Sequence, residues 1–152
     1  MNATHIHLIL NHFPIIGTLI GVGILAYGLF KNNDVVKKIA LTILAIMAII
    51  AVPVYLTGEE AEETVEHFKG ITKEIIHEHE ELAEKAILVM AVLGALSLAS
   101  IYAITKGLSF AKKITIITFI VSLITFGLFA KVGSLGGEIR HSEIRTNASN
   151  LS

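Results

Sequence analysis

The chain has no cysteine and carries little charge. The absence of cysteine excludes disulfides, thiolate metal sites and redox-active thiols. Only 16% of its 152 residues are charged, whereas soluble domains have roughly 25%. The sequence also lacks a phosphate-binding glycine loop, a nucleophile elbow and a basic surface with aromatic residues. It therefore does not indicate a kinase, a hydrolase or a nucleic-acid-binding protein.

The hydrophobic residues, 53% of the chain, lie mostly in four long runs that contain no Asp, Glu, Lys or Arg: 6–30, 39–56, 86–105 and 114–130. A helix that crosses ~30 Å of hydrocarbon needs roughly 17–25 such residues. We therefore predict an all-α integral membrane protein that folds as an up-down-up-down four-helix bundle. The predicted transmembrane domain covers 1–145, with helices at about 5–30, 38–57, 82–105 and 110–134.

The remaining charges fall on two sides of this bundle. Two short connections, 31–38 and 106–113, hold six lysines and the single aspartate, Asp34. Short lysine-rich connections stay in the cytoplasm. We therefore expect a multi-pass protein of the bacterial inner membrane, embedded in the lipid bilayer, with both termini outside the cytoplasm. The connection 58–81 is predicted to be an extra helical segment on the outer side, and 146–152 a flexible tail.

All the glutamates and all seven histidines lie toward the predicted outer side. His12 lies inside the first apolar run, and ionisable residues at membrane depth are costly and mark functional sites. At 1.5 Å of helical rise per residue, His7 and His12 come to the level of the end of the second helix and the start of the third. We predict that His12, together with His7 or His79, binds one cofactor at this end of the bundle.

The opening residues HLILNHFPI, at 7–15, resemble the H-P-x-x-x-H-F-P-I opening of a widespread family of small four-helix bacterial membrane proteins of unknown function. The resemblance continues with YLTG at 55–58 and SLGGEIRH at 134–141. Some members are joined to Rieske or c-type cytochrome domains, so the resemblance implies a redox role. It points to His7, His12, Pro14, Gly58, Gly136 and Gly137, and it leaves the choice between His77 and His79 open.

Two functions remain open, and the sequence does not decide whether the protein is an enzyme. The favoured one is electron transfer through haem b, with quinol or a partner cytochrome as the redox partner. Its predicted binding residues are His7, His12, His79, His141 and Arg140.

The alternative is a zinc, iron or copper site for sensing, transport or a small oxidase reaction. Its predicted ligands are His7, His12, Glu59, Glu62, Glu63, His77 and His79. A homo-oligomer is compatible with either function.

Overall fold

The computed structural model describes residues 7, 9–58 and 73–140, and these residues are almost entirely helical. They form four long helices: α2 (His12–Phe30), α3 (Asp34–Leu56), α5 (Lys73–Thr105) and α6 (Ala111–Arg140). Each helix is long and apolar enough to cross a bilayer. The prediction of an all-α chain with four helices of membrane-spanning length and composition is confirmed.

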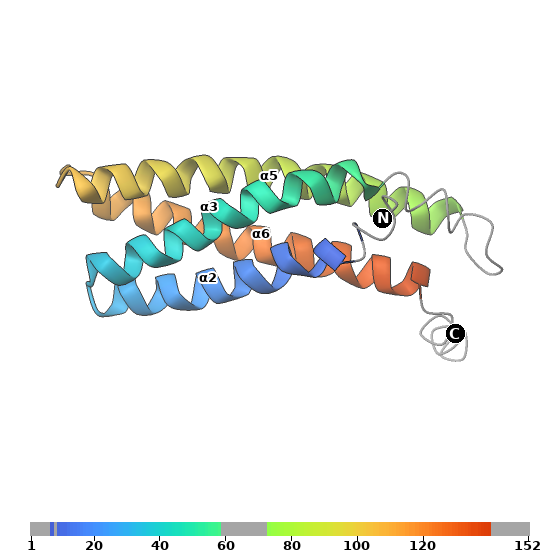
Figure 1. Ribbon diagram of the computed structural model, residues 1–152, viewed down its shortest axis with the longest axis horizontal. Coiled ribbons are helices and arrows are strands. Elements are labelled where there is room, and N and C mark those ends of the chain that lie inside the picture. The colour runs from blue at the N-terminus through green and yellow to red at the C-terminus, as the bar shows by residue number, and fades with distance from the viewer. Residues whose placement is uncertain (1–6, 8, 59–72, 141–152) are drawn as a thin grey trace.

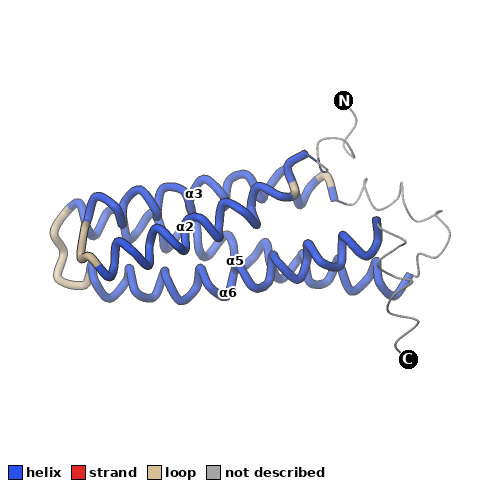
Figure 2. The backbone as a smooth tube through the Cα atoms, turned by 90° about the horizontal axis from the view of Figure 1, so that it is seen from below, coloured by secondary structure: helices blue, strands red, loops and turns tan. Residues whose placement is uncertain are grey.

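The four helices lie side by side along one long axis (Figure 1). The turn between α2 and α3 and the turn between α5 and α6 lie at the same end, which we call the lysine end (Figures 1 and 2). α2 packs against α3 and α6, and α5 packs against the same two helices. The helices α2 and α5 therefore occupy diagonal positions in the bundle. The end opposite the turns, where α3 and α6 finish, is called the open end below.

Side chains at the lysine end fix the first turn. The side chain of Asn33 caps α3 by accepting hydrogen bonds from the backbone N–H groups of Val35, at 3.0 Å, and Val36, at 3.2 Å. The buried ammonium of Lys37 donates to Asn32 Oδ1 at 3.0 Å and to Asp34 Oδ1 at 2.9 Å. A buried lysine is tolerated here because both of these acceptors serve its charge.

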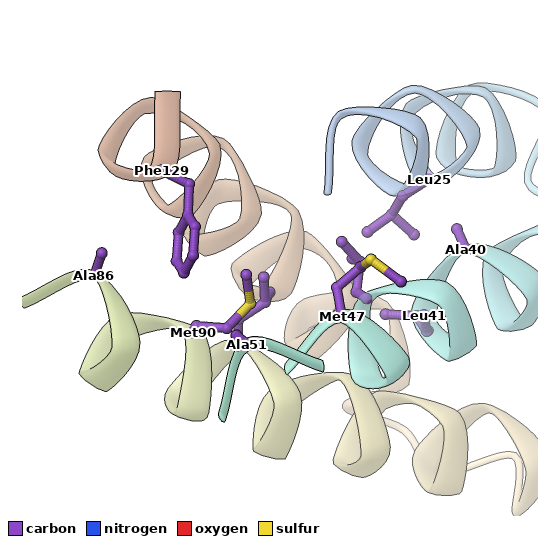
Figure 3. Packing of buried hydrophobic residues seen from close by; sticks show 10 residues of the cluster. Leu25, Ala40, Leu41, Met47, Ala51, Ala86, Met90 and Phe129 are labelled. Atoms are coloured by element: carbon purple, nitrogen blue, oxygen red, sulfur yellow. The ribbon is translucent and has the colours of Figure 1, made fainter. Parts of the chain in front are cut away.

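The bundle core follows a spacing of three and four residues along each helix. The buried positions of α2 include small residues, among them Gly21 and Gly28, which let helix backbones approach closely. Around them lies one hydrophobic cluster that draws on all four helices (Figure 3). Its members are Leu25, Ala40, Leu41, Leu44, Met47, Ala51, Ala86, Met90, Leu93 and Phe129.

Three helix boundaries differ from the sequence prediction. α5 begins at Lys73, inside the predicted connection 58–81, and α6 continues to Arg140 rather than ending near 134. α2 begins at His12, with a turn at Asn11 before it. Hydropathy marks where the membrane ends rather than where a helix ends, and the Glu- and Lys-rich start of α5 is polar but still favours helix. The proposed break near Gly70 and the tail 146–152 lie outside the described residues.

Two glycines of α2 provide a test of the helix packing. A Cβ atom at Gly28 would lie 2.9 Å from the backbone nitrogen of Lys37, whereas one at Gly23 would meet nothing within 4 Å. We expect Gly28→Ala to lower the melting temperature by several degrees, because overpacking against backbone costs about 1–3 kcal/mol. Gly23→Ala, the matched control, should leave the melting temperature unchanged or raise it. Equal effects of the two variants would contradict the α2–α3 packing described here.

Candidate functional site

His7 binds the end of α3. Its Nδ1 atom lies 2.9 Å from the carbonyl oxygen of Val54. A carbonyl oxygen only accepts, so Nδ1 carries the proton and donates it. Val54 lies in the last turn of α3, where backbone carbonyls have no partner within the helix. The bond therefore completes the helix end and leaves the lone pair of the ring on Nε2.

Two neighbours of Val54 complete the surroundings of His7. The Thr57 hydroxyl donates to the Pro53 carbonyl at 2.7 Å and lies 3.5 Å from His7 Nδ1. A Cβ atom on Gly58 would lie 3.5 Å from Cε1 of the same ring. The imidazole thus lies against backbone at Gly58, in space that a side chain would otherwise occupy.

His79 occupies a similar position on the other half of the bundle. It lies on α5, half-buried, and faces α6. A Cβ atom on Gly136 would lie 3.3 Å from its Cε1 atom. The ring also forms a hydrogen bond with the backbone of Val132, donating to its carbonyl. In a neutral ring that donates from one nitrogen, the other nitrogen carries the lone pair.

The two imidazoles lie close enough to interact electrostatically. His7 precedes α2 and His79 lies on α5, so the pair comes together from diagonally opposed parts of the bundle. Each ring is held by a carbonyl and lies beside a glycine of a neighbouring helix end: α3 for His7 and α6 for His79. The open end of the bundle therefore holds a pair of oriented imidazoles, which can provide two nitrogen ligands to one atom.

Burial affects the charge of this site. Desolvation lowers the pKa of His7 below its usual value of about 6.5, and the hydrogen bond to the Val54 carbonyl opposes this shift in part. The ring is therefore neutral at pH 7. The neutral form is the one that can bind a metal ion.

Two of the predicted site residues lie elsewhere. The side chain of His12 is exposed on the surface of α2, so it does not take part in the packed imidazole pair. His77 is exposed as well, and its Nδ1 atom lies 3.9 Å from Glu80 Oε2 one turn along α5. The prediction that His12 is the principal ligand rested on its depth, but depth does not say which side of a helix a residue occupies.

The other predicted residues contribute no described side chain. Glu59, Glu62, Glu63 and His141 lie outside the described residues, and Arg140 is the last residue of α6. Within 7, 9–58 and 73–140, no group of three or more His, Cys, Asp or Glu side chains is placed to hold a metal ion. The mixed imidazole–carboxylate site is thus not assembled by this part of the chain.

The sequence did contain a signal for the pair. The buried positions of α2 include Pro14 and Thr18, and His7 and Asn11 lie seven residues before them. On α5, His79 lies seven residues before the buried Ala86. A seven-residue step returns to nearly the same helix face. The helical phase of His7 and His79 therefore places them on the packed face, and that of His12 does not.

Comparisons with protein families, curated proteins and solved structures find no match for this chain. The family resemblance of the opening residues thus stays a prediction, and the function must be argued from the site itself.

The lowered pKa of His7 predicts a pH dependence. A histidine whose pKa is lower in the folded than in the unfolded protein binds its proton more readily after unfolding. We expect the protein without cofactor to be most stable above about pH 6.5 and to lose stability as the pH falls below that value. Thermal unfolding in detergent between pH 8 and pH 5 measures this, and His7→Ala should flatten the curve. An unchanged slope in His7→Ala would show that the pKa of His7 is not shifted.

Proposed function

We propose that this chain is a membrane electron-transfer protein that binds haem b, with His7 and His79 as the two axial ligands of the iron. The observation that supports this proposal is the pair of half-buried imidazoles at the open end, each held by a backbone carbonyl and flanked by a glycine. Ligation of haem iron by two protein side chains is ordinary chemistry for electron-transfer cytochromes.

The number of ligands favours haem over a bare metal ion. Haem supplies four nitrogen ligands of its own, so the protein needs to provide only two. A structural zinc site needs four protein ligands and a catalytic one needs three. The described residues offer two imidazoles here and no third His, Cys, Asp or Glu. The zinc, iron or copper alternative would depend on ligands outside these residues, such as Glu59, Glu62 or Glu63.

The orientation of His7 also fits a ligand. Histidines that bind metals usually donate the N–H of the second ring nitrogen to a backbone carbonyl or a carboxylate, which fixes the ring and increases its basicity. The bond from Nδ1 of His7 to the Val54 carbonyl is of this kind and directs Nε2 away from α3. Gly58 and Gly136 leave space beside the rings, since a Cβ atom at either position would contact the imidazole.

The layer beneath the imidazoles excludes water. Ala51, Ala86, Met90 and Phe129 are buried members of the hydrophobic cluster, and Ala86 lies two helical turns from His79 (Figure 3). A bound haem would accept and release one electron at a time in this low-dielectric environment. The protein groups would hold the ring nitrogens in place and keep water from the inner face.

The lysine asymmetry supports an orientation in the membrane. We propose that the four helices cross the bacterial inner membrane up-down-up-down, with the lysine end in the cytoplasm and both termini outside. The open end, with the imidazole pair, would then lie near the outer surface. Quinol in the membrane or a redox protein on the outer side would be able to reach it.

The ligand assignment predicts a specific pattern among four histidine variants. His7→Ala and His79→Ala should each convert the absorption spectrum of the haem-loaded protein from a six-coordinate to a five-coordinate form and lower the haem content. His12→Ala and His77→Ala, which change exposed side chains, are the matched controls and should keep the wild-type spectrum. Added imidazole should restore the six-coordinate spectrum of His7→Ala, because it replaces the lost ligand.

Two results would contradict this assignment. Loss of the spectrum in His12→Ala alone would support the ligand that depth predicted. Stoichiometric binding of zinc, iron or copper by a protein that takes up no haem would support the metal alternative. Haem content and metal content are both measured on the purified protein after expression with the haem precursor and with each metal.

The orientation has its own test. A reporter enzyme active only in the cytoplasm should be inactive when fused after residue 152 and active when inserted in the α5–α6 turn at Gly107. The opposite pattern would place the imidazole pair at the cytoplasmic surface.

A further inference from the structure

The two halves of the bundle have corresponding cores. Six buried positions of α2 match six buried positions of α5, each shifted by 72 residues. The pairs are Pro14 with Ala86, Thr18 with Met90, Gly21 with Leu93, Val22 with Gly94, Leu25 with Ser97, and Gly28 with Ser100. Unrelated apolar helices have no reason to share both the spacing and the phase of six positions.

The second helix of each half shows the same correspondence with a shift of 78 residues. The pairs of buried residues are Lys37 with Thr115, Ala40 with Thr118, Leu44 with Ser122, Met47 with Thr125, and Ala51 with Phe129. The larger shift means that the second half is longer at the lysine end, and α5 and α6 are indeed longer than α2 and α3.

The turns between the helices match as well, with a shift of 75. Lys31-Asn32 and Lys106-Gly107 begin the two turns, and Asn32 and Gly107 are the two described residues with positive φ, at 49° and 63°. The sequence Lys-Lys-Ile follows in both halves, at 37–39 and at 112–114. A repeated left-handed residue followed by a repeated sequence indicates that the hairpins share one design.

The candidate site repeats with the same shifts. His7 corresponds to His79 by 72 residues, and by 78 residues Val54 corresponds to Val132 and Gly58 to Gly136. These are the imidazole, the carbonyl that holds it and the glycine beside it. Each half of the chain thus supplies one complete copy of the same three-part arrangement.

We infer that the chain is a tandem repeat of one helical hairpin, and that its ligand site lies on the quasi-two-fold axis between the repeats, where His7 and His79 bind one central atom as equivalent ligands. This inference rests on the proposed function for the identity of the ligand. It adds that the ligand presents two equivalent faces, as a planar metal macrocycle does. It also specifies a centre with both axial positions filled, which suits electron transfer rather than the binding of a gas or the activation of oxygen.

Carbon monoxide tests the equivalence of the ligands. The reduced, haem-loaded wild-type protein should not bind carbon monoxide, because both axial positions are occupied. His7→Ala and His79→Ala should each bind it, to the same extent within twofold. A variant pair in which only one protein binds carbon monoxide, or a wild-type protein that binds it fully, would overturn the inference while leaving haem binding intact.

A cross-linking experiment tests the repeat without any cofactor. Gly94 on α5 packs directly on Ala48 of α3, since a Cβ atom at Gly94 would lie 2.7 Å from that of Ala48. The repeat makes Val22 on α2 and Phe126 on α6 the equivalent pair. Because the chain has no cysteine, Ala48→Cys with Gly94→Cys and Val22→Cys with Phe126→Cys each introduce one pair.

Both double variants should form an intramolecular disulfide on mild oxidation, detected by mass spectrometry. The control pair of Val22→Cys with Ile124→Cys should not, since Ile124 is exposed. Cross-linking of Ala48–Gly94 but not of Val22–Phe126 would overturn the repeat. Failure of the wild-type protein to bind haem, with both pairs cross-linked, would overturn the proposed function and leave the repeat standing.

Discussion

The hydrogen bond from His7 to the Val54 carbonyl determines what the open end of the bundle can do. It joins the segment before α2 to the end of α3, and it fixes which nitrogen of the ring carries the proton. Without it, the carbonyls in the last turn of α3 would need another partner, and the ring could rotate between tautomers. The equivalent bond from His79 to Val132 orients the second ring. The account of the site depends on these two contacts because they turn two histidines into two directed donors.

The rest of the bundle explains why these contacts can form. Helices in a bilayer gain little from burying apolar side chains, so they pack through small residues and hydroxyl groups. Gly21 and Gly28 on α2 bring it close to α3, and Ser100 on α5 lies 2.8 Å from Thr118 on α6, with both side chains buried. These contacts hold each hairpin together over its length. They thereby set the distance between the helix ends on which the imidazoles lie.

The sequence predicted the architecture more reliably than the site, and the reasons are physical. Runs such as 39–56 can only be membrane helices, so the number and approximate place of the helices followed from composition. The start of α5 at Lys73 was missed because its polar first turns lie beyond the apolar run, where hydropathy carries no information about helix. His12 was preferred over His7 because it lies deeper in the first run. α2 is apolar on every side, so its packed face is marked by small and polar residues such as Thr18 and Gly21 rather than by hydrophobicity. The predicted carboxylate ligands fall outside the described residues.

Electron paramagnetic resonance of the oxidised, haem-loaded protein tests the central claim most directly, because the signal of ferric haem reports both axial ligands at once. If His7 and His79 bind the iron from opposite sides, the spectrum will be that of low-spin ferric haem with two imidazole ligands, and it will persist in His12→Ala. A high-spin spectrum, or a signal only from haem that dilution or washing removes, would contradict the claim that the paired imidazoles form a ligand site.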